Sequence, residues 1–334
     1  MTKIAILGGG SWGTGLAVVL AHSRRSHTIS LWVRDPELAA TISSTRENTK
    51  YLPGISIPDQ VLVTTDLQEV LKEAPVAIGA LPAANVRTVL CHAMPFVSSD
   101  VILVSATKGL EPSTHLRISE VYAQSFCLRF VPRVAVLSGP SFALEAARGE
   151  PTAVVIASED RGLAAFLQEE FAGPTFRLYT NSDVLGVELA GSMKNVIAIA
   201  AGACQGLGLG ANTLAALVTR GLAEMTRLAV ALGAKQETLG GLAGLGDLVL
   251  TCHGALSRNR HVGFELGQGH SLDEILTGMT TVAEGVGTTA ALLALARDHH
   301  IDLPITQQVH SILHLGNAPR DAIRAIMERP LRSE

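Results

Sequence analysis

A glycine-rich turn near the N-terminus constrains the fold of this chain more than any other feature. The short apolar run Lys3 to Leu7 leads directly into the sequence G-G-G-S-W-G at residues 8–13, and a helical pattern follows from Thr14 to His22. A G-x-G-x-x-G segment alone is weak evidence, because any tight turn can be rich in glycine. Its position between a strand and a helix, however, is the context in which such a segment binds a dinucleotide.

Three of the glycines have separate roles in this interpretation. Gly8 permits the tight turn after the strand, and Gly10 lets a pyrophosphate approach the backbone. Gly13 lets the helix pack closely on the strand, and the helix N-terminus then binds the phosphate. The alternative is a glycine-rich turn that binds no ligand.

The second apolar run ends in the sequence L-W-V-R-D, which places Arg34 and Asp35 side by side. An acid at this point usually binds the ribose 2′-hydroxyl, whereas an arginine can pair with a 2′-phosphate. Asp35 precedes Pro36, so it can equally be the N-cap of the next helix. We therefore expect Arg34 to contact the ribose, with a solvated strand-end charge as the alternative. This favours NADP(H), with NAD(H) as the other option.

Two patterns divide the chain. Up to about Thr180, short apolar runs alternate with helical segments, which is typical of a parallel sheet built from βαβ units. Beyond Asn181 only helical patterns remain. We therefore predict an α/β fold, with a Rossmann-type dinucleotide-binding domain at 1–181 and an all-helical domain at 182–334. The predicted strands are 3–7, 28–33, 61–65, 76–81, 101–105, 134–138, 153–157 and 176–179, and the main predicted helices of the second domain are 182–204, 213–232, 257–268, 271–278, 288–299 and 306–314.

Charge is sparse in this aliphatic sequence. The chain has 26 basic and 30 acidic residues, a formal net charge of -4, so it lacks the basic surface that binds nucleic acid. We expect no nucleic-acid partner. Lysine is rarer still, which makes the position of each one informative: the six are Lys3, Lys50, Lys72, Lys108, Lys194 and Lys235.

The longest uncharged stretch, Asn195 to Thr219, is long enough to cross a bilayer. Glycines at 202, 206, 208 and 210 interrupt it, so we predict a buried helix, a glycine-rich turn and a second helix rather than a transmembrane segment. The chain opens without the apolar segment of an export signal. The four cysteines are widely spaced, which argues against a disulfide framework or a structural zinc site. We expect a cytoplasmic protein without a metal site.

Two of the lysines stand in apolar sequence. Lys194 is the only charged residue from Leu189 through Thr219. It either extends its ammonium group to the surface or points into a cleft, where desolvation favours the neutral form and suits it to proton transfer. Lys108 follows the predicted strand 101–105 at its carboxyl end, where ligands bind in open α/β sheets. The alternative for Lys108 is a solvated turn lysine.

A polar cluster stands out in the otherwise apolar second domain. Asp247 follows a glycine-rich segment, and Thr251 comes four residues later on the same helical face. The sequence S-R-N-R at 257–260 then combines an arginine fork with hydroxyl and amide donors, which suits phosphate binding. The alternative is a solvated helix start capped by Ser257.

Six segments occur together in a recognisable order: G-G-G-S-W-G-T at 8–14, S-A-T-K-G at 105–109, L-S-G-P-S-F-A at 137–143, E-L-A-G-S-M-K-N at 188–195, G-L-G-D at 244–247 and S-R-N at 257–259. In this order and approximate spacing, they resemble the bacterial NAD(P)-dependent glycerol-3-phosphate dehydrogenase family over essentially the whole chain. A β-hydroxyacid dehydrogenase also joins a Rossmann half to a helical half with a lysine, but S-G-P-S-F-A and S-R-N are not expected of that family.

The resemblance implies a helical domain like the C-terminal domain of 6-phosphogluconate dehydrogenase, and it implies site residues. Glu284 could instead be an exposed loop acid, and the segment 139–141 an ordinary strand-to-helix turn. Besides Gly8, Gly10 and Gly13, the implied cofactor contacts are Ser11, Trp12, Arg34, Lys108, Ala143, Arg258, Val282 and Glu284. The implied substrate contacts are Lys108, Gly139, Ser141, Lys194, Asp247, Ser257, Arg258 and Asn259, and the implied catalytic group is Lys194, Asp247, Asn195 and Thr251.

The implied reaction is hydride transfer that interconverts glycerol 3-phosphate and dihydroxyacetone phosphate. The resemblance also implies that the glycerol 3-phosphate is used for phospholipid synthesis. Lys194 would accept the hydroxyl proton in oxidation, held by Asp247 and Asn195, while Arg258 and Asn259 would bind the phosphate. Two alternatives remain open: a β-hydroxyacid dehydrogenase that acts on a small carboxylate, and a non-catalytic dinucleotide sensor. We also expect a homodimer, whose contact surface no motif identifies.

Overall fold

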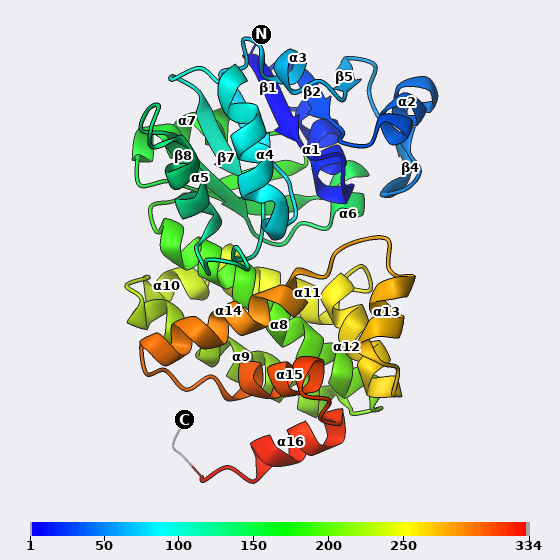
Figure 1. Cartoon of the computed structure of the whole chain (residues 1–334), viewed down its shortest axis with the longest axis vertical. Helices are drawn as coiled ribbons and strands as arrows, with labels where there is room; N and C mark the ends of the chain where they lie inside the picture. The colour runs from blue at the N-terminus through cyan, green and yellow to red at the C-terminus, as the bar shows by residue number, and fades with distance from the viewer. Residues whose placement is uncertain (1, 332–334) are drawn as a thin grey trace. The chain divides into compact units, whose positions relative to one another are not determined.

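The computed structural model describes residues 2–331, which form two compact units (Figure 1). Of the described residues, the first unit comprises 2–111 and Leu116–Glu188, and the second comprises Pro112–His115 and 189–331. We expected a domain boundary between residues 181 and 182. The units divide between Glu188 and Leu189, inside helix α8 (Val184–Gly206). Met1 and residues 332–334 of the two expected domains lie outside the described residues.

An eight-stranded sheet in the order β10-β9-β8-β7-β6-β1-β2-β5 forms the centre of the first unit. It has a strand at each of the eight predicted positions. Neighbouring strands are parallel except β8 and β9, which pair antiparallel. The parallel pairing predicted from the sequence does not extend to this pair, because a strand buried on both faces shows the same apolar pattern in either direction. The strands are β1 (Thr2–Leu7), β2 (His27–Trp32), β5 (Val61–Thr64), β6 (Val76–Gly79), β7 (Ile102–Ser105), β8 (Arg133–Ser138), β9 (Thr152–Ala157) and β10 (Phe176–Asn181).

Helices cover both faces of the sheet, because successive residues of a strand point to opposite faces. In β1, Ile4 and Ile6 share a core cluster with Leu16 of α1. Ala5 and Leu7 belong to a second cluster that contains Tyr122 of α5. The helices of this unit are α1 (Ser11–Ala21), α2 (Pro36–Thr45), α3 (Leu67–Leu71), α4 (Val86–Ala93), α5 (Ile118–Phe126), α6 (Ala143–Ala147) and α7 (Arg161–Phe171).

The second unit is helical over its described residues, and each of its six predicted helices is present. Three further helical segments were not predicted: α10, a π-helix at Leu242–Gly246 and α16. Helix α11 was indicated only by the placement of Asp247 and Thr251 on one helical face. Helix α14 also begins at Glu284 rather than Thr288, so Glu284 is not a loop residue. The helices after α8 are α9 (Ala211–Ala231), α10 (Gln236–Leu239), α11 (Asp247–His253), α12 (Arg258–Gln268), α13 (Leu272–Gly278), α14 (Glu284–Asp298), α15 (Pro304–His314) and α16 (Pro319–Met327).

Helices α8 and α12 cross with their backbones in contact, and glycines make this possible. A Cβ atom on Gly202 would lie 1.9 Å from the carbonyl oxygen of Arg260, and one on Gly263 would lie 1.9 Å from that of Ile199. Gly206 and Gly267 show the same close approach one turn further along. This crossing fixes the position of the N-terminal part of α12 against α8, the helix that carries Lys194.

Helix α8 is long and apolar enough, by length and composition alone, to cross a membrane. Most of it is buried, however, and core helices of globular domains meet the same criteria. The predicted break is present: α8 ends at Gly206, α9 begins at Ala211, and Gly208 between them has φ +77°.

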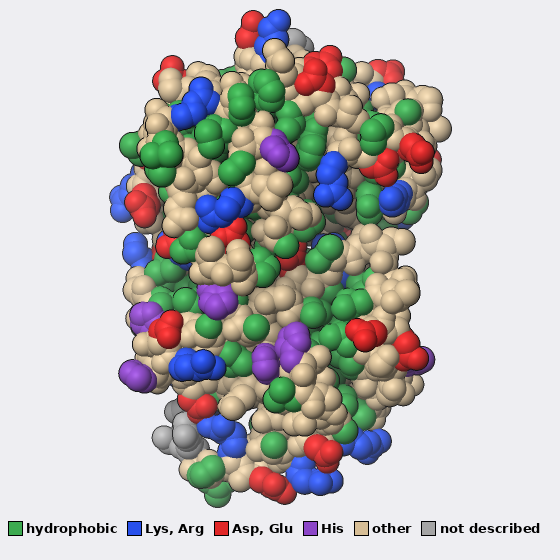
Figure 2. Space-filling model, viewed as in Figure 1, with side chains coloured by type: hydrophobic (Ala, Val, Ile, Leu, Met, Phe, Trp, Pro, Cys, Tyr) green, Lys and Arg blue, Asp and Glu red, His purple; other side chains and the backbone are tan. Residues whose placement is uncertain are grey.

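The sparse charge lies mainly on the exterior, where basic and acidic side chains are interspersed on the face shown in Figure 2. Among the lysines and arginines of residues 2–331, Lys194 alone is buried. The few buried acids are therefore held by neutral donors as well as by cations.

Glu224 on α9 is one such buried acid, and it caps the N-terminus of α15. Its carboxylate accepts hydrogen bonds from the backbone N–H groups of Ile305 (2.8 Å) and Thr306 (2.9 Å) and from the Thr306 hydroxyl (2.6 Å). Burial is the main influence on its pKa and raises it, while the Thr306 and Ile305 hydrogen bonds and Arg227 oppose the rise.

Replacing Glu224 with alanine is expected to lower the free energy of unfolding by about 1–3 kcal/mol, because two buried N–H groups lose their acceptor. The raised pKa means that the folded protein binds this proton more tightly than the unfolded chain. The advantage of wild type over Glu224→Ala should therefore shrink as the pH rises from 4.5, the group's ordinary value, through the raised pKa. Urea unfolding at a series of pH values tests this, with the exposed Glu328→Ala as the control; an advantage that grows with pH would refute it.

Candidate active site

The glycine-rich turn between β1 and α1 has a backbone that only glycine accommodates at two points. Gly8 has φ +126°, and a Cβ atom there would lie 2.3 Å from the carbonyl oxygen of Ala80. A Cβ on Gly13 would lie 1.9 Å from the carbonyl oxygen of Gly8. No atom lies within 4 Å of the Cβ position of Gly10, so the start of α1 faces open space. This geometry fits the pyrophosphate of a dinucleotide at a helix N-terminus.

A segment that the sequence did not indicate holds this turn in place. Asn48 is buried and donates to the carbonyl oxygen of Gly9 (3.0 Å) and to the hydroxyl of Thr14 (2.8 Å). The Ser11 hydroxyl donates to the carbonyl oxygen of Tyr51 (2.7 Å). A polar residue in a two-residue strand gives no sequence signal of burial, so Asn48 could not be identified in advance. The segment belongs to a hairpin of β3 (Glu47–Asn48) and β4 (Leu52–Ser56).

Arg34 and Asp35 follow β2 and have different surroundings. Asp35 is the N-cap of α2, because its carboxylate accepts from the N–H groups of Glu37 (3.0 Å) and Leu38 (3.3 Å). The helix-capping interpretation of Asp35 is therefore confirmed. Arg34 is exposed beside it, at the end of the strand.

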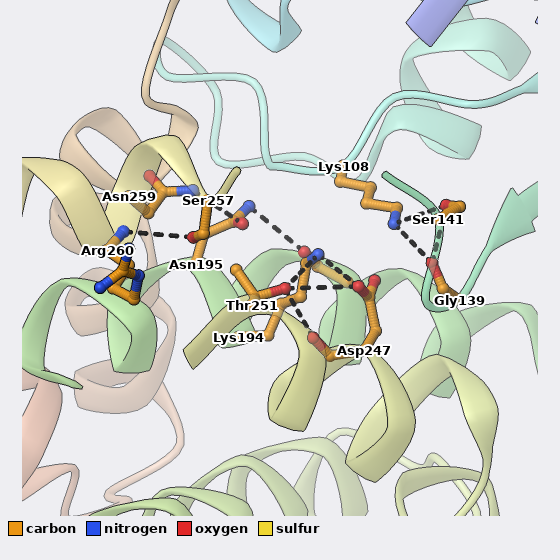
Figure 3. Close-up of polar contacts among 11 residues, drawn as sticks. Lys108, Gly139, Ser141, Lys194, Asn195, Asp247, Thr251, Ser257, Asn259 and Arg260 are labelled. Atoms are coloured by element: carbon orange, nitrogen blue, oxygen red, sulfur yellow. Dashed lines mark hydrogen bonds and ion pairs between the residues drawn. The ribbon is translucent and has the colours of Figure 1, made fainter. Parts of the chain in front are cut away.

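Lys108 is joined to the turn that follows β8. Its Nζ donates to the carbonyl oxygen of Gly139 (2.8 Å) and lies 3.5 Å from the Ser141 hydroxyl. Gly139 has φ +121°, a conformation that favours glycine, and its carbonyl oxygen faces the lysine (Figure 3). Ala143 begins α6 directly after this turn. A cation, a hydroxyl and a helix start thus meet at the carboxyl ends of β7 and β8, where open sheets bind ligands.

Lys194 forms the centre of the corresponding cluster in the second unit (Figure 3). Its Nζ lies 2.6 Å from Oδ1 of Asp247 and 2.9 Å from Oγ1 of Thr251. The Thr251 hydroxyl also donates to the Asp247 backbone carbonyl (2.6 Å). All three side chains are buried. The lysine is therefore held inside the protein and does not extend to the surface.

A π-helix positions Asp247. The segment Leu242–Gly246 has the wider π-helical turn and passes directly into α11, which begins at Asp247. A Cβ on Gly244 would lie 2.0 Å from the carbonyl oxygen of Leu239, so this turn requires glycine there. π-helical turns of this kind often occur at functional sites.

Next to Lys194, a chain of amide hydrogen bonds connects three helices. Asn259 on α12 donates to Oδ1 of Asn195 on α8 (2.9 Å) and accepts from the backbone N–H of Gly285 on α14 (2.9 Å). Asn195 in turn donates to the carbonyl oxygen of Gly191 (3.3 Å). Both asparagines are buried, so their orientation is fixed by these bonds.

Of the residues around Asn259, some make hydrogen bonds within the protein and others are exposed. Ser257 caps α12 by accepting from the N–H of Arg260 (3.2 Å), and Arg260 binds Gln205 of α8 (2.7 Å). Arg258 is exposed as a whole residue, whereas burial around its guanidinium lowers its pKa and Glu284 opposes that effect. Val282 is exposed just before α14. Arg258 is thus the more exposed of the two arginines in this polar cluster.

Cys252 is buried in the helix that carries Asp247 and Thr251. Burial raises its pKa to about 12; Asp247 adds to the rise and Lys194 opposes it. The thiol is therefore neutral near pH 7 and is not a nucleophile there.

Comparison with known proteins gives a consistent result. The model of the N-terminal domain of NAD-dependent glycerol-3-phosphate dehydrogenase matches residues 3–164, and that of the C-terminal domain matches residues 183–324. The chain is 52% identical to a glycerol-3-phosphate dehydrogenase [NAD(P)+] of Koribacter versatilis, over 100% of this chain and 99% of the relative. It is 49% identical to one of Nitratidesulfovibrio vulgaris, over 99% and 100%. The crystal structure of glycerol-3-phosphate dehydrogenase from Coxiella burnetii is similar, with a TM-score of 0.92 and 41% identity over 98% of this chain and 99% of that one.

Proposed function

The chain belongs to the NAD-dependent glycerol-3-phosphate dehydrogenase family, and from this premise we propose how its own residues carry out the reaction. It is an NAD(P)-dependent enzyme that interconverts sn-glycerol 3-phosphate and dihydroxyacetone phosphate. The main support for the catalytic roles proposed below is that Lys194 is buried and contacts Asp247 and Thr251.

Lys194 is the proton carrier of this proposal. When bound, the nicotinamide supplies or accepts the hydride. In the oxidation direction, the neutral amine at Nζ of Lys194 takes the proton from the substrate hydroxyl; in reduction, the ammonium group returns it. The Asp247 carboxylate stabilises the ammonium form, and Thr251 fixes the direction of Nζ. Asn195, which accepts a hydrogen bond from Asn259, is the remaining member of the proposed catalytic group.

The substrate phosphate needs compensating charge in a protein of net charge -4. We assign this to the guanidinium of Arg258 and to Lys108 with the Gly139–Ser141 turn. Ser257 and Asn259 complete the substrate contacts; the Asn259 amide has a second N–H besides the one given to Asn195.

The cofactor contacts proposed for the first unit are Gly8, Gly10, Ser11, Trp12, Gly13, Arg34, Lys108 and Ala143, and those of the second are Arg258, Val282 and Glu284. The exposed Arg34, next to an aspartate used as a helix cap, supports a preference for NADP(H) over NAD(H).

We further propose that the enzyme supplies glycerol 3-phosphate for phospholipid synthesis, and that it acts as a cytoplasmic homodimer. Its four cysteines are free thiols, which suits a reducing compartment.

The substrate assignment is tested by following NADPH absorbance with dihydroxyacetone phosphate and with a panel of 2- and 3-keto acids. We expect oxidation of NADPH with dihydroxyacetone phosphate and little with the acids, because the proposal assigns Arg258 and Lys108 to a phosphate group. Faster turnover of a keto acid would support a β-hydroxyacid dehydrogenase. NADPH binding without any turnover would support a dinucleotide sensor.

A further inference from the structure

Lys50 lies beside the strand end that carries Arg34. Its Nζ is 3.7 Å from Oδ2 of Asp35 and 5.3 Å from the centre of the Tyr51 ring. Its side chain remains about half exposed, so the ammonium group is accessible to a ligand. The capping role of Asp35 and its contact with Lys50 together engage both oxygens of that carboxylate.

The position of Lys50 is fixed by the glycine-rich turn itself. Asn48 and Tyr51 flank it closely in sequence, and both are hydrogen-bonded to the turn: Asn48 to Gly9, and Tyr51 through the Ser11 hydroxyl. Lys50 therefore lies on a segment that is hydrogen-bonded to the glycine-rich turn at residues 8–13, although the two are far apart in the sequence.

We propose that Lys50 is a specificity-determining residue, which binds the 2′-phosphate of NADP(H) together with Arg34. This inference rests on the proposed preference for NADP(H). A phosphomonoester carries up to two negative charges, and two cations from separate segments match it better than one arginine does. Asp35, engaged by its helix and by Lys50, is a poor acceptor for the 2′-hydroxyl of NAD(H).

The test compares wild type with Lys50→Met, using Arg34→Ala as the positive control and the exposed Lys72→Met as the matched control. Calorimetry measures binding of 2′,5′-ADP and of 5′-AMP, which differ only in the 2′-phosphate, and steady-state kinetics measures KM for NADPH and NADH. We expect Lys50→Met to weaken 2′,5′-ADP and NADPH by about tenfold, the loss of one charge-assisted contact. Binding of 5′-AMP and KM for NADH should stay within about twofold, and Lys72→Met should change none of these values.

Three outcomes separate this inference from its premise. An unchanged ratio of 2′,5′-ADP to 5′-AMP affinity in Lys50→Met, with loss in Arg34→Ala, would overturn the role of Lys50 alone. Equal binding of both nucleotides by wild type would overturn the NADP(H) preference and the role of Lys50 with it. Binding of both nucleotides without reduction of dihydroxyacetone phosphate would contradict the enzymatic function. The role of Lys50 would then be decided by the calorimetric affinities for 2′,5′-ADP and 5′-AMP alone.

Discussion

Replacing Lys194 with alanine is expected to lower kcat for reduction of dihydroxyacetone phosphate by about 10³-fold, within the range of general acid–base catalysis. The variant loses the one buried cation of the described chain and with it the group that moves the proton. Affinity for 5′-AMP, which reports on the glycine-rich turn of the first unit, should be unchanged. Steady-state kinetics and calorimetry on the same preparation separate the two effects.

The Lys194→Ala variant leaves the Asp247 carboxylate buried without its partner, which can destabilise the fold by about 3–5 kcal/mol. A double variant, Lys194→Ala with Asp247→Asn, removes both charges and should recover much of that stability while remaining inactive. Lys235→Met changes an exposed lysine of the same unit and should retain wild-type activity. An inactive single variant with an active double variant would show that the loss came from unfolding, not from chemistry.

Replacing Gly263 with alanine is expected to cost about 3 kcal/mol of unfolding free energy, the upper end for overpacking. The added methyl group would meet backbone atoms of α8, the carbonyl oxygen of Ile199 at 1.9 Å and the nitrogen of Ala203 at 2.9 Å. Backbone cannot rotate away as a side chain can, so α12 must move off α8. Urea unfolding measures the loss.

The same displacement should reduce activity. Helix α12 carries Asn259, whose 2.9 Å hydrogen bond to Asn195 holds the residue next to Lys194. A shift of about 1 Å at a reacting group can cost about 10²-fold in rate, so we expect a loss of that order in kcat. Gly278→Ala is the matched control, because no atom lies within 4 Å of its Cβ position. A Gly263→Ala protein with wild-type stability and kcat would refute the role of this crossing.

The strands and the major helices were predictable because apolar periodicity directly reflects burial. The direction of β9 was not, since a strand buried on both faces has the same pattern whichever way it runs. The π-helix lies in the glycine-rich segment 240–246, where low helix propensity conceals local structure, and a Cβ on Gly244 would lie 2.0 Å from the carbonyl oxygen of Leu239. The four-residue α10 is too short to show a helical period.

In the candidate site, too, the sequence indicated some residues and not others. Lys194 was conspicuous as a lone charge in apolar sequence, and Asp247 and Thr251 shared a helical face. Asn48 and Lys50 were not recognisable, because their importance comes from contacts with residues distant in the sequence, at Gly9 and Asp35. Such pairings depend on tertiary structure and leave no local pattern.

Proton transfer by Lys194 is the central step of the proposed reaction, and amine rescue tests it most directly. Lys194→Ala, loaded with NADPH and mixed with dihydroxyacetone phosphate, is followed by NADPH absorbance in a single turnover, with and without ethylamine. We predict slow oxidation that accelerates with ethylamine concentration, while wild type does not respond. Hydride transfer in Lys194→Ala at nearly the wild-type rate, indifferent to the amine, would contradict the account.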